Sequence, residues 1–311
     1  MNHTKPNIIL SVDVECWGQS VLDRSLPILP HAADNVRRLM QLFELHNAKA
    51  TLFVLGKFAE VHPDVVAQAA DAGHEIASHG YGHVEVFRMS PSEFRDDIRK
   101  ASDIIAGIVG RRPKGYRAPV FSIRRDSIWA LDVLADEGFE FDSSIFPFAG
   151  PRYGIADWPA GPCTVKTKSG HSIVEYPPTT LQLFGRRLPV GGGGYARLLP
   201  KRVLRMCFDR ATRDRSTPPV FYCHPYEIDK TEIDTHYPGT PLKRRLHQGI
   251  GRKSFWSKLD ALLTRFSGTT FGSAIAKATA LPRITPGEPE NCETPKPRPA
   301  CATDIAYAAD V

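Results

Sequence analysis

The segment Ile8-Ile9-Leu10-Ser11-Val12-Asp13-Val14-Glu15 decides the fold that this chain is expected to adopt. Its nearly continuous apolar run is typical of a strand that is buried on both faces of a parallel sheet. Two carboxylates fall at its carboxyl end, where α/β sheets and barrels gather their ligands. Asp13 and Glu15 project to the same side of an extended strand, so one can bind a metal ion while the other faces its water.

A second stretch, Ser78-His79-Gly80-Tyr81-Gly82-His83, holds two histidines four residues apart. If the backbone is helical or tightly turned, side chains at this spacing lie on one face about 5–6 Å apart. That separation suits two imidazoles on one zinc ion. Either histidine alone is more often an ordinary core or surface residue, so the pair needs a third ligand, which the carboxylates of the first strand can supply.

Strands and helices alternate along the first half of the chain. Apolar spacing predicts strands over residues 8–15, 50–56 and 75–78, and helices over residues 31–46, 58–72 and 125–137. The capping box Ser90-Pro91-Ser92-Glu93 starts a further helix that runs to about Val109. Strands separated by helices of this length predict a parallel sheet that is rolled into a barrel.

Three further polar residues follow strand-like stretches, as Arg117 in Gly115-Tyr116-Arg117-Ala118-Pro119, Asp142 in Phe141-Asp142-Ser143-Ser144, and His224 in Val220-Phe221-Tyr222-Cys223-His224-Pro225. Each has a simpler explanation when taken alone. Arg117 could form a surface ion pair, Asp142 could cap a turn, and His224 could be a structural strand end. Their common position at strand ends favours one shared site.

Composition limits the class of protein. With 311 residues and 42% hydrophobic content, the chain can form one large catalytic domain, which we place at residues 6–275. The net charge of +6 permits contact with an anionic polymer or a membrane surface. The basic residues are scattered, however, and no basic and aromatic ribbon indicates nucleic-acid binding. The six cysteines form no CxxC pair, which favours a reducing compartment over a disulfide framework.

The two ends of the chain carry different expectations. Residues 1–6 lack the apolar core of a signal peptide and no later segment approaches the ~20 apolar residues of a membrane span, so a cytoplasmic location is expected. Residues 281–311 hold six prolines and little apolar content, which predicts a disordered tail.

These residues resemble the five motifs of the polysaccharide deacetylases, carbohydrate esterase family 4 or the NodB-homology group. The resemblance covers roughly residues 6–230. In chain order it rests on Asp13 with Glu15, Ser78-His79 to His83, Arg117-Ala118-Pro119, Asp142 and His224. The runs Gly191-Gly192-Gly193-Gly194-Tyr195 and His224-Pro225-Tyr226-Glu227-Ile228-Asp229 are similar to the branch associated with exosortase and PEP-CTERM exopolysaccharide systems.

The resemblance implies a distorted (β/α)7-type barrel that uses a divalent metal to hydrolyse an N-acetyl group. It implies zinc, with cobalt, nickel or manganese as alternatives, bound by a carboxylate, His79 and His83. The commoner family form has adjacent aspartates, whereas Val14 follows Asp13 here. The ligand role is therefore carried to Glu15, and which acid is the ligand stays open.

The resemblance also assigns catalytic roles. Asp13 would take a proton from water, Arg117 would orient Asp13, and His224 would protonate the departing amine. Asp142 would be the carboxylate that orients His224 and raises its pKa. A backbone N–H near Ala118 or Tyr116 would stabilise the oxyanion.

Residues 146–200 are expected to form a substrate-side insertion. Tyr153 and Trp158 supply aromatic rings that could stack on sugars. The Gly191–Gly194 run lacks the Lys-Ser/Thr of a phosphate loop, and it is expected to shape the groove together with Tyr195 and Arg197.

Three functions are compatible with the sequence. The leading one is N-deacetylation of N-acetylhexosamine units in an exopolysaccharide or its lipid-linked precursor. The second is hydrolysis of small cyclic amides or ureides, as in allantoinases of the same fold, and the third is a sugar-binding module without catalysis. The expected partner is a carbohydrate, with peripheral membrane association as a further option and no nucleic acid. The oligomeric state is not indicated.

Overall fold

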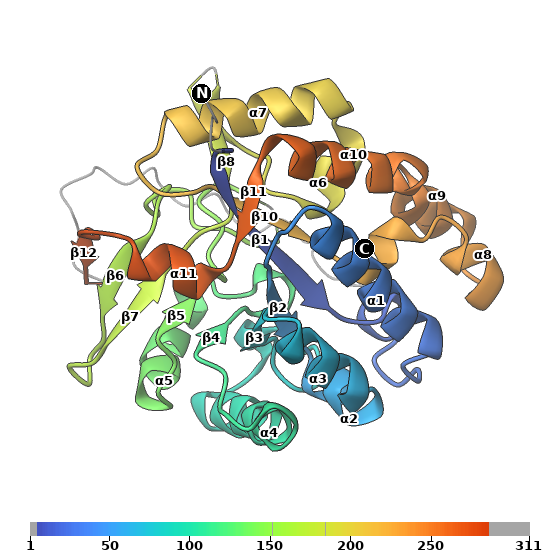
Figure 1. The fold of residues 1–311 in the computed structure, drawn as a ribbon. Helices are drawn as coiled ribbons and strands as arrows, with labels where there is room; N and C mark the ends of the chain where they lie inside the picture. The colour runs from blue at the N-terminus through green and yellow to red at the C-terminus, as the bar shows by residue number, and fades with distance from the viewer. Residues whose placement is uncertain (1–4, 151, 184, 286–311) are drawn as a thin grey trace, which may run out of the picture.

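A parallel sheet forms the centre of the structure, a computed structural model that describes residues 5–150, 152–183 and 185–285 (Figure 1). Within the described residues, seven strands pair in parallel in the order β10-β1-β2-β3-β4-β5-β7. Their bounds are β1 Asn7–Val14, β2 Thr51–Val54, β3 Glu75–Ser78, β4 Gly115–Tyr116, β5 Phe141–Asp142, β7 Ser172–Glu175 and β10 Val220–Cys223. The parallel sheet predicted from the sequence is confirmed.

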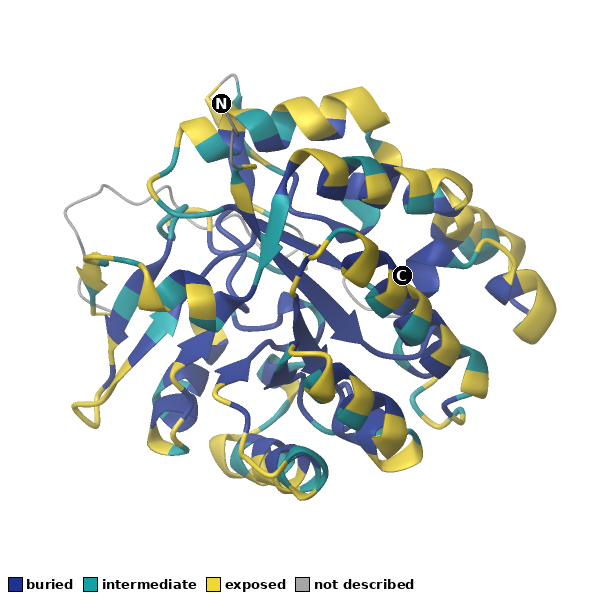
Figure 2. Cartoon of the chain, in the orientation of Figure 1, coloured by how far each residue is buried: buried dark blue, intermediate teal, exposed yellow. Residues whose placement is uncertain are grey.

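Helices surround this sheet, with the strands buried at the centre and the exposed residues on the outer faces of the helices (Figure 2). They are α1 Pro30–Leu45, α2 Gly56–Val61, α3 Pro63–Asp71, α4 Pro91–Val109, α5 Ala130–Asp136, α6 Gly193–Leu198, α7 Lys201–Arg213, α8 Glu232–His236, α9 Leu242–Gly249, α10 Arg252–Arg265 and α11 Phe271–Ala276. None of the helices in the described ranges is long and apolar enough to cross a membrane.

The barrel is distorted between β7 and β10, where the chain makes isolated contacts in place of a ladder. Thr179 joins β10 through its hydroxyl, which donates to the carbonyl of Val220 and accepts from its N–H. Gly192 forms a single bridge with Tyr222. The hairpin β8 Thr180–Leu183 and β9 Arg186–Pro189 extends from this gap, while β6 Cys163–Lys166 runs antiparallel to β7 and β11 Ser267–Thr269 pairs with β1.

Alternation along β1 separates the core from the site. Ile8, Leu10, Val12 and Val14 belong to the apolar cluster under the outer helices. The intervening side chains, Ile9, Ser11, Asp13 and Glu15, face the barrel interior, because successive side chains of a strand point to opposite faces. The carboxylates therefore lie at the carboxyl end of the strand inside the barrel, as the sequence predicts.

Phe271 of α11 closes the other end of the barrel. Its ring stacks on Phe141 at 5.4 Å between centroids and meets Phe53 at 5.6 Å. Ile9, Ala77 and Val220 complete this inner cluster. Apolar side chains thus fill much of this end of the barrel, and the carboxylates of Asp13 and Glu15 lie toward the opposite end.

Three local predictions are wrong. The helix expected over residues 58–72 is two helices, since Pro63 has no N–H to continue α2 and disfavours helical dihedrals at His62. The helix expected over 125–137 is shortened to α5 by a turn at Arg125–Ser127. The expected disorder from residue 281 is contradicted at β12 Arg283–Ile284, which pairs with β6. The tail prediction for residues 286–311 lies outside the described residues.

Candidate metal and catalytic site

Glu15, His79 and His83 bring three ligand atoms together above the end of β1. These atoms all lie within 4.8 Å of one another, and all three residues are buried. Oε2 of Glu15 is 2.7 Å from Nε2 of His83 and 3.5 Å from Nε2 of His79. Two imidazoles and a carboxylate form the kind of donor set that catalytic zinc sites use.

The loop after β3 turns the two histidines toward Glu15. Gly80 has a φ of +73° and His83 a φ of +58°, so the chain is tightly turned and not helical between the imidazoles. The carboxylate of Asp97 on α4 accepts the N–H of Tyr81. A Cβ at Gly80 would lie 2.8 Å from Asp97 Oδ2. Glycine is therefore required at position 80 by both its φ and this close approach.

His79 carries its ring proton on the nitrogen that points away from the site. Its Nδ1 lies 2.8 Å from the carbonyl oxygen of Arg117, which can only accept a hydrogen bond. Nδ1 therefore carries a proton, and Nε2 is the ring nitrogen that faces Glu15. Such a second contact fixes the tautomer and the orientation of a metal-binding histidine.

Unpartnered polar atoms test whether these residues fit a cation. Within the described residues, Glu15 Oε2 is buried and makes no hydrogen bond, although two imidazoles lie against it. Burial alone would raise the pKa of the Glu15 carboxyl, but His83 and His79 more than offset burial and hold it well below the usual range. Tyr226 donates its hydroxyl to Glu15 Oε1 at 3.2 Å. An ionised carboxylate facing two imidazole nitrogens fits a divalent cation.

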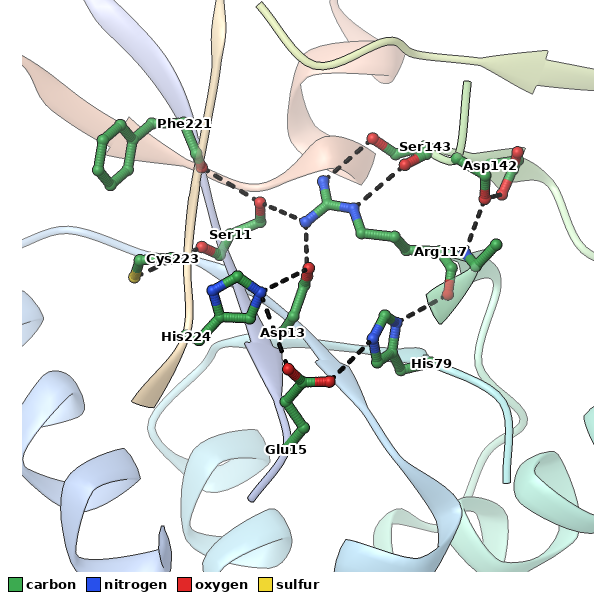
Figure 3. Close-up of polar contacts among 12 residues, drawn as sticks. Ser11, Asp13, Glu15, His79, Arg117, Asp142, Ser143, Phe221, Cys223 and His224 are labelled. Atoms are coloured by element: carbon green, nitrogen blue, oxygen red, sulfur yellow. Dashed lines mark hydrogen bonds and ion pairs between the residues drawn. The ribbon is translucent and has the colours of Figure 1, made fainter. Parts of the chain in front are cut away.

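Asp13 and Arg117 form a buried ion pair beside this cluster (Figure 3). Arg117 Nη1 lies 2.7 Å from Asp13 Oδ1 and donates to the hydroxyl of Ser11 at 3.0 Å. The guanidinium also donates to the carbonyl and the hydroxyl of Ser143, and its face lies 4.1 Å from the ring centroid of Phe53. Asp13 is therefore held in one orientation, with Oδ1 engaged and Oδ2 directed toward His224 at 3.9 Å.

His224 is oriented by Glu227 and not by Asp142, which corrects the role that the resemblance gave to Asp142. Nδ1 of His224 lies 3.3 Å from Glu227 Oε2, and the same oxygen accepts the backbone N–H of His224 at 3.0 Å. Burial lowers the pKa of His224, but the hydrogen bond and charge of Glu227, with Glu15 and Asp13, raise it overall. Arg197 pairs with the other oxygen of Glu227 at 2.9 Å. The pair fits the short loop after β10, in which residues 224 and 227 are one turn apart.

Asp142 lies on the far side of the Arg117 side chain from His224 (Figure 3). Its buried carboxyl is paired with that of Glu175. Burial, followed by the charge of Asp142, raises the pKa of Glu175 well above its usual value. Glu175 is therefore protonated and donates to Asp142, whose other oxygen accepts the hydroxyl of Ser144 at 2.5 Å. Asp142 thus supports the strand ends around Arg117 instead of contacting His224.

The backbone N–H of Ala118 is occupied. It donates to the hydroxyl of Ser144 at 2.7 Å, so the oxyanion role expected near Ala118 is contradicted for this donor. The following Val120 and Phe121, which line the cavity, have φ values of 57° and 52°. Non-glycine residues in this left-handed region cost of order 1–3 kcal/mol each and concentrate at functional sites.

An open cavity of about 680 Å³ leads to these residues. One wall is aromatic, with Phe121, Tyr153, Tyr195 and Tyr222, and Gly194 and Arg197 also line it, as the groove prediction required. Trp158, which we expected to stack on sugars, is instead buried in the cluster with Ile155 and Cys163. It is therefore a core residue.

Sequence reasoning missed Ser11, Glu227 and Glu175. The first two could have been found from local sequence. Ser11 is two residues before Asp13 and therefore points to the same side of the strand. Glu227 follows His224 by three residues within the segment His224–Asp229. Glu175 carries no such signal. It reaches Asp142 only because β5 and β7 are neighbours in the sheet.

Comparisons with known proteins assign two parts of the chain. Residues 21–139 match the family model described as polysaccharide deacetylase, and residues 143–276 match one described as a domain of unknown function, DUF3473. A peptidoglycan-N-acetylglucosamine deacetylase of Bacillus cereus is 33% identical over 96 residues, which are 30% of this chain and 35% of that protein. A peptidoglycan deacetylase of Helicobacter pylori is 31% identical over 110 residues, or 35% and 36% of the two chains. The chain thus spans about a third of these relatives.

Solved structures share the fold over nearly the whole chain. A Mycobacterium smegmatis protein assigned to the polysaccharide deacetylases superposes with a TM-score of 0.60 at 19% identity, covering 93% of this chain and 96% of its own. The Puue allantoinase superposes with a TM-score of 0.58 at 16% identity, covering 88% and 93%. Both support the (β/α)7 barrel. Residues 21–139 of this chain thus match the polysaccharide deacetylase family, the NodB-homology group of carbohydrate esterase family 4.

Proposed function

We propose that the protein is a metal-dependent hydrolase that removes N-acetyl groups from N-acetylhexosamine units of an exopolysaccharide or its precursor, releasing acetate. The observation that carries the proposal is the cluster of Glu15, His79 and His83. Asp13, which forms an ion pair with Arg117, lies next to this cluster. Relatives named peptidoglycan and chitooligosaccharide deacetylases support the reaction class. The exopolysaccharide substrate rests on the resemblance to the exosortase-associated branch.

Glu15, His79 and His83 would hold a divalent cation, for which zinc is the first choice. A cation there polarises the acetamide carbonyl and lowers the pKa of water. Asp13 would accept the proton of the attacking water on Oδ2, since Oδ1 is engaged by Arg117. The buried guanidinium holds Asp13 in place, so the carboxylate needs no reorganisation during the step.

His224 would deliver a proton to the departing amine. Its Nε2 lies 3.9 Å from Oδ2 of Asp13, so the groups that accept and donate protons face the same point. The carboxylate of Glu227 stabilises the imidazolium and fixes the ring, and Arg197 in turn holds Glu227. The proposed acid and the proposed base would thus act at neighbouring points of one amide group.

The shape of the cavity supports a sugar substrate. Its volume of about 680 Å³ exceeds what a single acetamide needs. The rings of Tyr153 and Tyr195, which share a hydroxyl contact at 3.2 Å, offer apolar faces with polar edges, as sugar rings require. A sugar unit could lie against this wall while its acetamide reaches Glu15 and Asp13.

Acetate release from N-acetylglucosamine oligomers by zinc-loaded protein tests the proposal. His79→Ala should reduce the rate at least ~100-fold and lower the bound zinc per chain, because metal-binding residues are needed for both. His171→Ala removes an exposed histidine of the β6–β7 hairpin and serves as the matched control with unchanged rate and zinc content.

Full activity of the metal-free protein would contradict the proposal. Ring opening of cyclic amides or ureides without acetate release would replace it with an allantoinase-like function, since the barrel is shared by both classes. Saturable binding of oligosaccharides without any turnover in the zinc-loaded protein would indicate a sugar-binding module.

A further inference from the structure

The short helix α9 carries an apolar stripe that faces solvent. Leu242 and Leu246 lie one turn apart on one side of α9, and Ile250 follows directly after the helix. Their exposed fractions are 70%, 61% and 50%. Gln248, on the opposite side, is buried and anchors the helix through its carbonyl, which accepts from Arg197 and Arg252. These contacts hold the Gln248 side of α9 against the barrel, so the leucine side of the helix faces solvent.

Leu198 of α6 extends this stripe. Leu198, at the end of α6, is 65% exposed, and the guanidinium of its neighbour Arg197 donates to the carbonyl of Ile250. Val203 and Met206 are exposed on α7, which follows directly. Six of the nine large apolar side chains that are exposed among the described residues thus belong to residues 198–250. We call Leu198, Leu242, Leu246 and Ile250 the apolar patch.

Positive charge surrounds the apolar patch. In residues 235–259, four of six Lys or Arg residues are not buried, namely Lys243, Arg244, Arg245 and Lys253, and Arg245 pairs with Asp234. Residues 201–213 add five exposed Lys or Arg residues and one Asp. On α9, Lys243 and Arg245 flank the leucines on the two sides of the helix, because they stand at about ±60–100° from Leu242 around the axis.

We propose that the apolar patch and its basic border dock onto the surface of an anionic phospholipid bilayer. A leucine stripe flanked by Lys and Arg is the pattern of helices that lie in the membrane interface. Each basic residue near an anionic surface strengthens binding about fivefold, which suits a border of this charge. A protein partner is less well matched, because the cores of protein interfaces are depleted in Lys and other charges.

The apolar patch lies at the mouth of the catalytic cavity. Leu198 and Ile250 line both the patch and the cavity, together with His247 and Gln248. A docked bilayer would therefore lie beside the entrance to the site. Resting on the proposed function, this geometry points to a sugar that is attached to a lipid anchor, which would reach Glu15 and Asp13 from the membrane surface and not from bulk water.

Co-sedimentation with vesicles tests the docking without any measure of activity. The full-length protein should bind vesicles of phosphatidylcholine with 30% phosphatidylglycerol, about tenfold or more tightly than vesicles of phosphatidylcholine alone. Leu242→Ser with Leu246→Ser should weaken that binding at least about tenfold. Leu45→Ser with Val61→Ser, which removes two exposed apolar side chains on α1 and α2, is the matched control and should bind like the wild type.

A second variant examines the charge. Lys243→Gln with Arg244→Gln should weaken binding to the anionic vesicles about tenfold or more and reduce its sensitivity to salt, since two charges near the surface are lost. Equal sedimentation of the wild type and the leucine variant would overturn the proposal. So would a stable dimer in sedimentation velocity that the leucine variant abolishes while neither protein binds vesicles, because the patch would then be a contact between two copies of the chain.

Discussion

At the scale of single residues, Asp13 and Glu15 have different surroundings although they stand two positions apart on β1. Glu15 faces two imidazole nitrogens, and Asp13 faces a guanidinium. A base that must accept a proton benefits from a fixed orientation, and a metal ligand benefits from neighbouring ligands. The surroundings therefore favour Glu15 as the ligand and Asp13 as the base.

Glu227→Gln should lower kcat about 10- to 100-fold without loss of bound zinc. The amide cannot stabilise the imidazolium of His224 as a carboxylate does, and burial of the group leaves it no water to take over. Acetate release and zinc content of the same preparation provide the measurement.

Asp142→Asn is the comparison for that prediction. It should change the rate less than Glu227→Gln, because Asp142 contacts Ser144 and the protonated Glu175 and does not approach His224. If Asp142→Asn lowered kcat by more than Glu227→Gln, the orientation of His224 by Glu227 would be wrong.

At the scale of secondary structure, the ends of the parallel strands position the site and their beginnings stabilise it. At the amino end of β3, His74 is buried and its Nδ1 accepts the N–H of Ala50 at 3.2 Å. Burial, with a contribution from Lys49, lowers the pKa of His74 to about 4. The imidazole is therefore neutral in the folded protein at neutral pH, with its proton on Nε2.

This neutral histidine makes stability depend on pH. The folded state disfavours the charged imidazole, so the contribution is fully present above the unfolded pKa of ~6.5 and is lost as the pH falls toward 4. The loss should be about 1–3 kcal/mol in the free energy of unfolding. His74→Asn offers an oxygen to Ala50 and cannot titrate, so its difference in unfolding free energy between pH 7 and pH 4.5 should be smaller by that amount.

Urea unfolding of the metal-free proteins measures this difference, since removing the metal eliminates the pH dependence of metal binding. The same pH dependence in His74→Asn and the wild type would show that His74 does not titrate in this range.

Local patterns predict some elements well and others poorly, for physical reasons. The start of α4 follows the prediction at Ser90 because a capping box satisfies its own N–H groups within four residues. The apolar spacing over residues 58–72 predicts one helix, but the missing N–H of Pro63 ends the hydrogen-bond series of α2. The Asp142–Glu175 pair and the occupied N–H of Ala118 depend on contacts between separate strands, which no local pattern contains.

At the scale of the whole molecule, the metal should stabilise the barrel. Its ligands come from β1 and from the loop after β3, so a bound cation would bind the folded state alone. Zinc at a hundredfold excess over Kd should add about 2.7 kcal/mol to the free energy of unfolding. We expect Tm to rise by several degrees.

Differential scanning calorimetry of the protein with zinc and with a chelator measures this rise in Tm. His79→Ala should reduce the rise strongly, while His171→Ala should keep it. An equal rise in the wild type and in His79→Ala would mean that zinc stabilises the chain at another place.

The link from Arg197 through Glu227 to His224 has a consequence for how such chains can change. Asp13 and Glu15 precede residue 21, and His79 and His83 lie in the region that matches the deacetylase model. His224, Glu227 and Arg197 lie in the DUF3473 region. Neither matched region holds the whole candidate site. A recombination that exchanged one half between related genes would have to preserve the angle at which β10 meets β1, so the two regions should be inherited as one unit.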